Sequence, residues 1–304
     1  AGTVLSAGLA MRHAERQTLV EEAARANEQL GLYANSLHTL IERYRALPAV
    51  LALDPELRAA LQGPVATETQ DALNRKLEKI NGAARSSTLE LLNHEGLAVA
   101  ASNWRLPSSY VGHNYGFRPY FKQTRSQGSG RFYAVGVTSG IPGYFLASAV
   151  KADNQDFLGA MVVKLEFPEL EHEWSQGNDT LLVSDARGIV FIANQPGWRY
   201  RHLQPLSSND LEEIKLTRQY DKQPLTPLQH QTLQRFDDNS SLARVEGPEG
   251  RASYLWESLP LAAEGWTLHL LRKPPNAFEE TRNAGLAAAG AWLTLVFLLL
   301  FLNQ

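Results

Sequence analysis

Two basic residues of this 304-residue chain stand where a positive charge needs a partner. Arg118 lies among aromatic residues in Phe117-Arg118-Pro119-Tyr120, and Lys164 lies inside the apolar run Met161–Leu165. Taking either side chain out of water costs free energy unless an anion meets it or its charged end returns to solvent. A guanidinium offers a planar fork to a carboxylate, and an ammonium offers a point charge. The two residues therefore indicate a site for a small anion.

Further donors lie between these two cations in the sequence. Thr138, Ser139 and Gly140 stand at the end of an apolar run, where hydroxyls and backbone N–H groups can converge on an anion. Tyr115 precedes Arg118 by three residues, and Tyr144 follows a Pro-Gly turn, so both could add phenol donors and apolar walls.

Each of these residues also has an ordinary structural interpretation. Arg118 could cap backbone carbonyls, and Lys164 could lay its stem on a sheet with its head in water. Tyr115 and Tyr144 could be core residues whose hydroxyls are satisfied. The residues alone leave both interpretations open.

The sequence shows no other set of residues with a recognisable chemistry. It lacks a phosphate-binding loop, an HExxH pair and a GxSxG turn, so we expect no catalytic residues and no cofactor. The triplet Glu171-His172-Glu173 resembles a metal site, but neighbours on a helix do not face one way. The histidines are scattered without metal-ligand spacing, so we expect no metal site.

Three short apolar runs, 131–139, 144–150 and 157–167, predict strands, because each is rich in Val, Phe and Tyr and bounded by turn residues. Arg118-Pro119 predicts a helix start, since proline tolerates the first helical turn.

A weak internal repeat indicates two modules. TLELLNHEGLAVAASNW from Thr88 and TLLVSDARGIVFIANQPGW from Thr180 both predict strand, glycine-containing turn and strand, and they lie about 92 residues apart. We expect a first module at 87–177, closed by a helix over 168–176, and a second at 178–273. The second would contain a helix near 208–221, a polar stretch to Ser241, and three strands with a hairpin turn at Pro248-Glu249-Gly250.

The segment 12–86 predicts helices. Apolar residues recur at helical spacing over 12–47, and Pro48 is expected to end that long helix. Asp54-Pro55 predicts the start of a second helix, and Thr67 with Gln70 has the spacing of a capping box. The long apolar stripe suggests a homodimer, since such a stripe needs a partner. The fold class is therefore α+β, with a long helix before two modules built on antiparallel sheets.

Both ends of the chain point to a membrane. Residues 284–302 carry no charge, and about 19 helical residues span a hydrocarbon core of about 30 Å. We therefore predict a juxtamembrane and transmembrane helix over 274–304, and interpret 1–11 as the end of a first membrane helix.

Composition narrows the class of protein. The net charge is −3 and no basic block occurs, so nucleic acid is not an expected partner. The absence of cysteine excludes disulfides and thiolate chemistry and is compatible with a periplasmic location.

At FRPYF, YAVGVTSGIPGYF and the strand ending VVK, the chain resembles the extracytoplasmic sensor of C4-dicarboxylate sensor histidine kinases. The resemblance implies two tandem PAS-like, or double Cache, modules in a periplasmic region of an inner-membrane protein. It implies a C4-dicarboxylate ligand in the membrane-distal module, relay through the membrane-proximal module, and a response regulator as the partner of the kinase. It also implies that Tyr115, Arg118, the turn Thr138–Gly140 and Lys164 contact the ligand's carboxylates, whereas Tyr144 is added from its place beside the turn.

Three alternatives remain at this point. A chemotaxis receptor would have the same site and a different cytoplasmic part. A related ligand, such as a five-carbon keto acid or an aromatic or amino acid, would use the same cations, although an ammonium needs an acidic partner and residues 110–152 contain none. An enzyme of the cell envelope would need the catalytic set that the sequence does not show.

Overall fold

The computed structural model describes residues 2–275, which divide into two compact units. The first unit comprises Asn35–Leu170 and Pro205–Leu225. The second comprises the described residues up to Ala34, the segment Glu171–Gln204 and the described residues from Thr226 onward. Residues 205–225, expected in the second module, thus cluster with the first unit.

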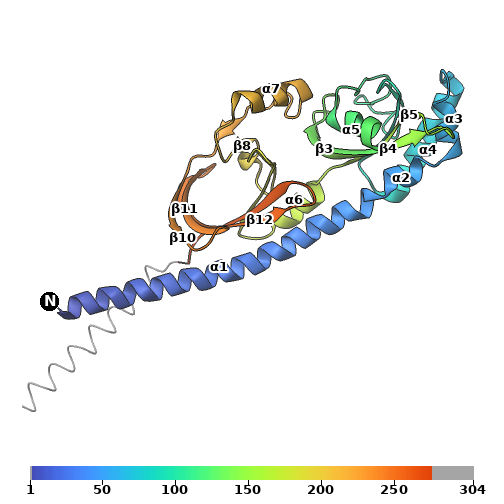
Figure 1. Ribbon diagram of the computed structural model, residues 1–304. Coiled ribbons are helices and arrows are strands. Elements are labelled where there is room, and N and C mark those ends of the chain that lie inside the picture. The colour runs from blue at the N-terminus through green and yellow to red at the C-terminus, as the bar shows by residue number, and fades with distance from the viewer. Residues whose placement is uncertain (1, 276–304) are drawn as a thin grey trace, which may run out of the picture. The chain divides into compact units, whose positions relative to one another are not determined.

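The first unit is built on a five-stranded antiparallel sheet with the order β2-β1-β5-β4-β3. Its strands confirm the three expected apolar runs, except that the run 131–139 is a strand only to Val135 and turns after it. The bounds are β1 Thr88–Asn93, β2 Ala98–Ala101, β3 Ser129–Val135, β4 Pro142–Lys151 and β5 Phe157–Leu165. Helix α5, Pro119–Gln127, covers one face of this sheet (Figure 1). On that face Tyr120 stacks on Phe145 with the ring centroids 5.1 Å apart.

The second unit is built on a six-stranded antiparallel sheet with the order β10-β11-β12-β13-β6-β7, which curves in Figure 1. Its strands are β6 Thr180–Ser184, β7 Val190–Ala193, β10 His230–Arg235, β11 Ser240–Gly247, β12 Gly250–Leu261 and β13 Trp266–Arg272. The hairpin turn at Pro248-Glu249 joins β11 and β12 as expected. Strand β10 was not predicted, because its side chains are polar and mostly exposed. Two short parallel strands, β8 Arg201–His202 and β9 Thr226–Pro227, flank the segment 205–225.

The two sheets share one topology, which confirms the repeat. In each, a hairpin occupies one edge (β2-β1 and β7-β6) and three consecutive antiparallel strands follow (β5-β4-β3 and β13-β12-β11). The hairpin turns contain Gly96 and Gly188 at φ +87° and +77°, a backbone conformation that favours glycine. Each hairpin is also closed by a side chain: Ser102 Oγ accepts the N–H of Leu89, and Asn194 Oδ1 accepts the N–H of Leu181.

The helices before the first sheet follow the sequence with two corrections. They are α1 Gly2–Arg45, α2 Leu47–Leu51, α3 Pro55–Ala60 and α4 Thr67–Ala84. Pro48 does not end the helical run by itself, because it lies in the first turn of α2, where its missing N–H is not needed. Asp54 caps α3 as expected, but Thr67 is not a cap: it is the first residue of α4, and Gln70 donates to the Val99 carbonyl instead.

The apolar stripe of α1 is buried within the chain. Leu19, Ala23, Ala26 and Leu30 lie in the second unit, and Leu37 and Ile41 in the first, each at most 6% exposed. The stripe therefore already has a partner, and the homodimer prediction no longer follows from it. The remaining helices are α6 Pro168–Ser175 and α7 Ser208–Thr217, with a 3-10 turn η1 at Pro196–Trp198.

No helix within residues 2–275 is both long and apolar enough to cross a membrane. The predicted transmembrane helix lies outside the described residues, since the description ends at residue 275. The expected first membrane segment, 1–11, forms the beginning of α1 from Gly2 onward.

Asn194 provides a test of the second sheet. Its buried side chain accepts from Leu181 N at 3.0 Å and donates to the carbonyls of Trp174 and Asp179 at 3.1 and 2.8 Å. Asn194→Ala should lower the free energy of unfolding by about 3 kcal/mol, because it leaves buried backbone groups unpaired. Urea denaturation measures this, with the exposed Asn178→Ala as control. Equal stability of the two variants would contradict this role of the hydrogen bonds.

Candidate functional site

Arg118 caps helix α5 in sequence, but its guanidinium binds backbone elsewhere in the first unit. Nη1 donates to the carbonyls of Thr217 and Arg218, both at 3.0 Å, and Nη2 donates to the carbonyl of Val135 at 2.7 Å. The residue is 1% exposed, and burial lowers its pKa. The alternative that Arg118 binds carbonyls is therefore realised, with carbonyls distant in sequence.

Lys164 is buried in β5 and has an anionic partner. Its Nζ donates to Glu166 Oε1 at 2.7 Å, to the Ile141 carbonyl at 3.0 Å and to Ser139 Oγ at 3.4 Å. The side chain of Lys164 is 2% exposed and that of Glu166 is 23% exposed, so the ammonium does not reach solvent. The partner was missed although Glu166 follows two residues later, the spacing that places side chains on one face of a strand.

Close backbone approach fixes the position of the Lys164 stem. A Cβ added to Gly143, on the neighbouring strand β4, would lie 2.5 Å from Lys164 Cε and 2.9 Å from the Leu165 carbonyl oxygen. Only glycine fits at this position. Gly143 therefore leaves the space that the Lys164 side chain occupies.

The predicted turn and tyrosine lie close to these cations. The hydroxyls of Tyr115 and Thr138 are 2.7 Å apart, and Tyr110 donates to Ser139 Oγ at 3.3 Å. The N–H of Gly140 donates to the Gly136 carbonyl at 2.7 Å, so it is engaged within the turn. Burial raises the pKa of Tyr115, which keeps its hydroxyl protonated.

Glu90 is a buried acid that the sequence analysis missed. It lies on β1, is 3% exposed, and its Oε1 accepts from the Tyr120 hydroxyl at 3.2 Å. Burial raises its pKa to about 7, although the Tyr120 hydrogen bond and the charges of Lys164 and Arg118 act in the opposite direction. Glu90 is a charged residue inside the apolar strand Thr88–Asn93, just as Lys164 is inside β5. This signal in the sequence could have identified Glu90 as a candidate site residue.

A small cavity joins several of these groups. Its volume is about 10 Å³, about the space that one water requires. The residues around it come from β1, β4, α5 and the loops at 110–118 and 136–138, and they are Glu90, Tyr110, Tyr115, Arg118, Tyr120, Gly136, Val137, Thr138 and Phe145. Lys164 Nζ lies 6.0 and 5.8 Å from the ring centroids of Tyr110 and Phe145, which places it beside the cavity wall.

The structure thus brings together most, but not all, of the residues predicted for the site. Tyr115, Arg118 and Thr138 line the cavity, while Ser139 and Lys164 lie next to it through their contacts with Tyr110. Tyr144 does not line it. Phe145 faces the cavity, and successive residues of a strand point to opposite faces, so Tyr144 lies on the other face of the sheet.

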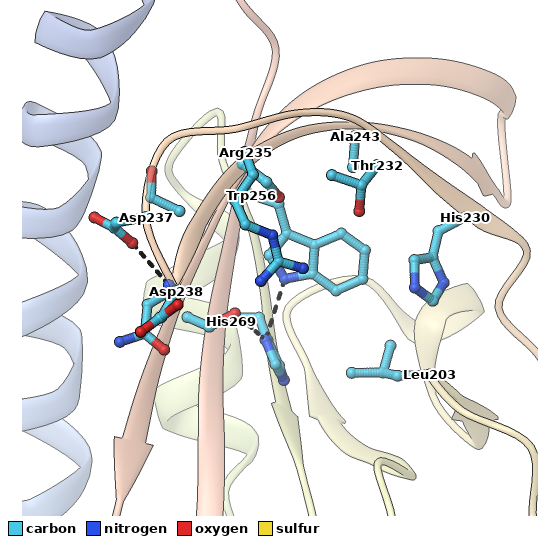
Figure 2. A pocket seen from close by; sticks show the side chains of 13 residues that line it. Leu203, His230, Thr232, Arg235, Asp237, Asp238, Ala243, Trp256 and His269 are labelled. Atoms are coloured by element: carbon cyan, nitrogen blue, oxygen red, sulfur yellow. Dashed lines mark hydrogen bonds between the residues drawn. The ribbon is translucent and has the colours of Figure 1, made fainter.

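A second cavity, of about 180 Å³, lies in the second unit (Figure 2). The indole of Trp256 forms part of its wall, with His230 at a ring-centroid distance of 5.2 Å. Arg235, Asp237 and Asp238 line it from the end of β10 and the turn that follows. None of the residues predicted for the ligand site lies there.

His269 is a neutral side chain that holds Trp256 in the wall of this second cavity. The Trp256 indole donates to its Nδ1 at 3.2 Å (Figure 2), so Nδ1 is an acceptor and the proton lies on Nε2. Nε2 is 2.9 Å from Ser184 Oγ. Burial lowers the pKa of His269 to about 4. The imidazole therefore serves packing and hydrogen bonding, not titration near neutral pH.

The possible metal ligands of α6 have other roles. Glu171 forms an ion pair with Arg199 and accepts from Ala193 N at 3.4 Å, while His172 and Glu173 are exposed. Among residues 2–275, no group of three or more histidine or acidic side chains could hold a metal ion.

Comparison with known proteins finds two related sensor proteins, while no family model matches the chain. The C4-dicarboxylate transport sensor protein DctB of Rhizobium meliloti (strain 1021) is 34% identical over 308 residues, which covers 99% of this chain and 49% of that protein. DctB of Pseudomonas aeruginosa is 32% identical over 283 residues, 93% of this chain and 43% of that protein. The chain thus spans about half the length of these relatives.

Solved structures show the same fold. The sensor domain of the histidine kinase DctB from V. cholerae superposes with a TM-score of 0.76 at 27% identity, covering 84% of this chain and 98% of that one. The ligand-binding domain of the Pseudomonas fluorescens chemoreceptor CtaA shares the fold alone, with a TM-score of 0.56 at 14% identity over 83% of this chain and 97% of that one. By sequence and by fold, the chain is a homologue of the C4-dicarboxylate transport sensor proteins and has the architecture of their periplasmic, Cache-type sensor region.

Proposed function

We propose that this chain is the periplasmic signal-input region of a membrane-anchored two-component sensor histidine kinase. Its first unit binds a C4-dicarboxylate such as succinate, malate or fumarate, and its second unit passes the signal toward the membrane. The observation that carries the proposal is the pair of buried cations, Arg118 and Lys164, beside one cavity in a homologue of C4-dicarboxylate sensors.

Arg118 can bind the chain and a ligand at once. Its three hydrogen bonds to carbonyls use two Nη1 hydrogens and one Nη2 hydrogen. A guanidinium has five N–H donors, so the Nε hydrogen and one Nη2 hydrogen remain for a carboxylate. Two parallel N–H donors suit the two oxygens of a carboxylate.

Lys164 must exchange a partner to bind a ligand. An ammonium has three donors, and contacts to Glu166, Ile141 and Ser139 use all of them. The contact to Ser139 is the longest, at 3.4 Å, and is the one that a ligand oxygen replaces at the lowest cost. A four-carbon diacid is also several times larger than a water, so the residues around the cavity of about 10 Å³ must move apart to admit it.

The contacts of Arg118 offer a route for the signal. Its Nη1 holds the carbonyls of Thr217 and Arg218 at the end of α7, and the chain on either side of this segment continues into β8 and β9 of the second unit. A ligand that shifts Arg118 while these hydrogen bonds persist would move the end of α7 with it. Such a ligand shifts the balance between two arrangements only by its difference in affinity for them.

Lys164 tests the ligand class. Lys164→Met keeps the length of the side chain and removes the charge, so it should weaken dicarboxylate binding about 10- to 100-fold and weaken monocarboxylates less. Calorimetry of the chain against a panel of organic acids measures both. Lys151→Met, an exposed lysine at the end of β4, is the matched control. If the unaltered chain gives no heat with any diacid, the proposed function is wrong.

Arg118 should serve folding and binding together. Arg118→Met leaves the carbonyls of Val135, Thr217 and Arg218 without their donor and should lower the free energy of unfolding by at least about 3 kcal/mol. Arg125→Met, an exposed arginine on the same helix, should leave stability unchanged. Arg118→Lys retains the charge, so it should fold better than Arg118→Met and still lose most of the diacid affinity, because a single ammonium cannot replace the fork. Diacid affinity in Arg118→Lys equal to that of the unaltered chain would refute the role in binding.

The relay and the homodimer have one joint test. Residues 1–304 contain no cysteine, so Ala24→Cys, Asn35→Cys and His38→Cys, at exposed positions of α1, each place one thiol in this region, and the unaltered full-length protein gives the background. In membranes containing the full-length protein, these thiols should crosslink two copies, and diacid should change the yield along the helix. Glu68→Cys on α4 is the control. Crosslinking that is identical with and without ligand would exclude relay through α1.

A further inference from the structure

Glu90 has one carboxylate oxygen without a partner. Its Oε1 accepts from Tyr120, whereas Oε2 is buried and has no hydrogen-bond partner among the atoms that the structure describes. Burying an unpaired carboxylate oxygen is costly. Glu90 also lines the cavity with Arg118, Tyr115 and Thr138, so the unpaired oxygen belongs to a side chain of the cavity wall.

The groups that face Glu90 come from every element packed around it. Tyr120 approaches from helix α5, Arg118 from the N-cap position before that helix, and Lys164 from the neighbouring strand β5. Tyr115 lies in the loop before α5. Lys164 lies opposite Thr88 on the sheet, two residues from Glu90 on the same face, and is itself paired with Glu166. Glu90 is the one acid among the residues that line this cavity.

An ionised Glu90 and a dicarboxylate dianion cannot share this cavity at low cost. Two negative charges a few ångströms apart repel strongly where water is excluded, and one of them then holds a proton. A protonated carboxyl is also a hydrogen-bond donor, which a carboxylate ligand can accept. A proton on Glu90 removes the repulsion between the two carboxylates. It also lets Oε2 form a hydrogen bond with the ligand.

We propose that Glu90 is a ligand-binding residue that holds a proton in the complex and donates it, from Oε2, in a hydrogen bond to a carboxylate oxygen of the diacid. The proton comes from solvent on binding and returns to solvent on release. Binding of a dicarboxylate by this chain is therefore coupled to uptake of about one proton wherever the free carboxyl is ionised. This inference rests on the proposed function.

The pKa of Glu90 places this coupling near neutral pH. Burial raises the pKa from 4.5 to about 7, so the free carboxyl is mostly protonated below pH 6 and mostly ionised above pH 8. Because the folded pKa is the higher one, the contribution of Glu90 to stability is present below about pH 4.5 and is lost as the pH rises through about 7. Diacid affinity should follow the same direction and weaken as the pH rises.

Calorimetry of the chain with succinate, in buffers of different ionisation enthalpy between pH 6.5 and 8.5, tests the coupling. The unaltered chain should take up close to one proton at pH 8.5, and its affinity should fall by about tenfold per pH unit above pH 7. Glu90→Gln keeps a donor that does not titrate, so proton uptake should disappear and the affinity should be flat across this range. At pH 8.5 the variant should therefore bind at least tenfold more tightly than the unaltered chain.

Glu257→Gln is the matched control. Glu257 is a buried acid of the second unit, bonded to Ser240, whose pKa burial also raises to about 7. Its replacement removes a similar titration far from the ligand in sequence and should leave proton uptake on binding unchanged. Thermal unfolding of all three proteins at pH 8.5 verifies that each is folded during the titrations.

The outcomes separate this inference from the proposed function. If no diacid binds, the proposed function fails. If succinate binds without proton uptake at pH 8.5, or if Glu90→Gln retains the pH dependence, Glu90 is not the proton acceptor and the inference fails. Tighter binding of an amino diacid than of succinate at pH 8.5, lost in Glu90→Gln, would show an ionised Glu90 paired with an ammonium and would also overturn it.

Discussion

The buried guanidinium of Arg118 is the constraint on which the first unit depends. A charge removed from water must be compensated locally, and three backbone carbonyls from two separate stretches of chain do so. Each hydrogen bond to a charged group contributes about 1.5–3 kcal/mol net, so the side chain binds strand β3 to the end of α7. The side chain proposed to bind the ligand therefore also holds two parts of the first unit together.

The buried charges of this unit form a balanced set. Lys164 is neutralised by Glu166, while Glu90 lies within the field of both cations and bonds to Tyr120. A diacid bound as proposed would use the remaining donors of Arg118 and would replace a partner of Lys164. On the proposed function, the affinity of such a ligand would be the difference between the contacts it makes and those it replaces, and a second carboxylate would add to the contacts made.

Local features of the fold could be predicted from the sequence, and long-range partners could not. Turn glycines, the cap at Asp54 and the apolar strands depend on neighbours in sequence, so residue types and spacing were sufficient. Two of the three partners of Arg118, the carbonyls of Thr217 and Arg218, lie about 100 residues away, and nothing in their own sequence marks a carbonyl as an acceptor. Thr67 and Gln70 have the spacing of a capping box, but the Gln70 side chain donates to the Val99 carbonyl, about 30 residues away. Residues 110–152 contain no acid, as stated, but Glu90 reaches the same cavity from β1, so the absence of an acid in that stretch does not by itself exclude a partner for an ammonium.

Residues 205–225 cluster with the first unit, so the unit proposed to bind the ligand is not encoded by one continuous stretch of sequence. A gene fragment ending at Leu170 would contain Arg118 and omit Thr217 and Arg218, two of its three acceptors. A chimaeric protein that contains this unit would therefore need both Asn35–Leu170 and Pro205–Leu225. A crossover between residues 170 and 205 would separate Arg118 from the carbonyls of Thr217 and Arg218 that it binds.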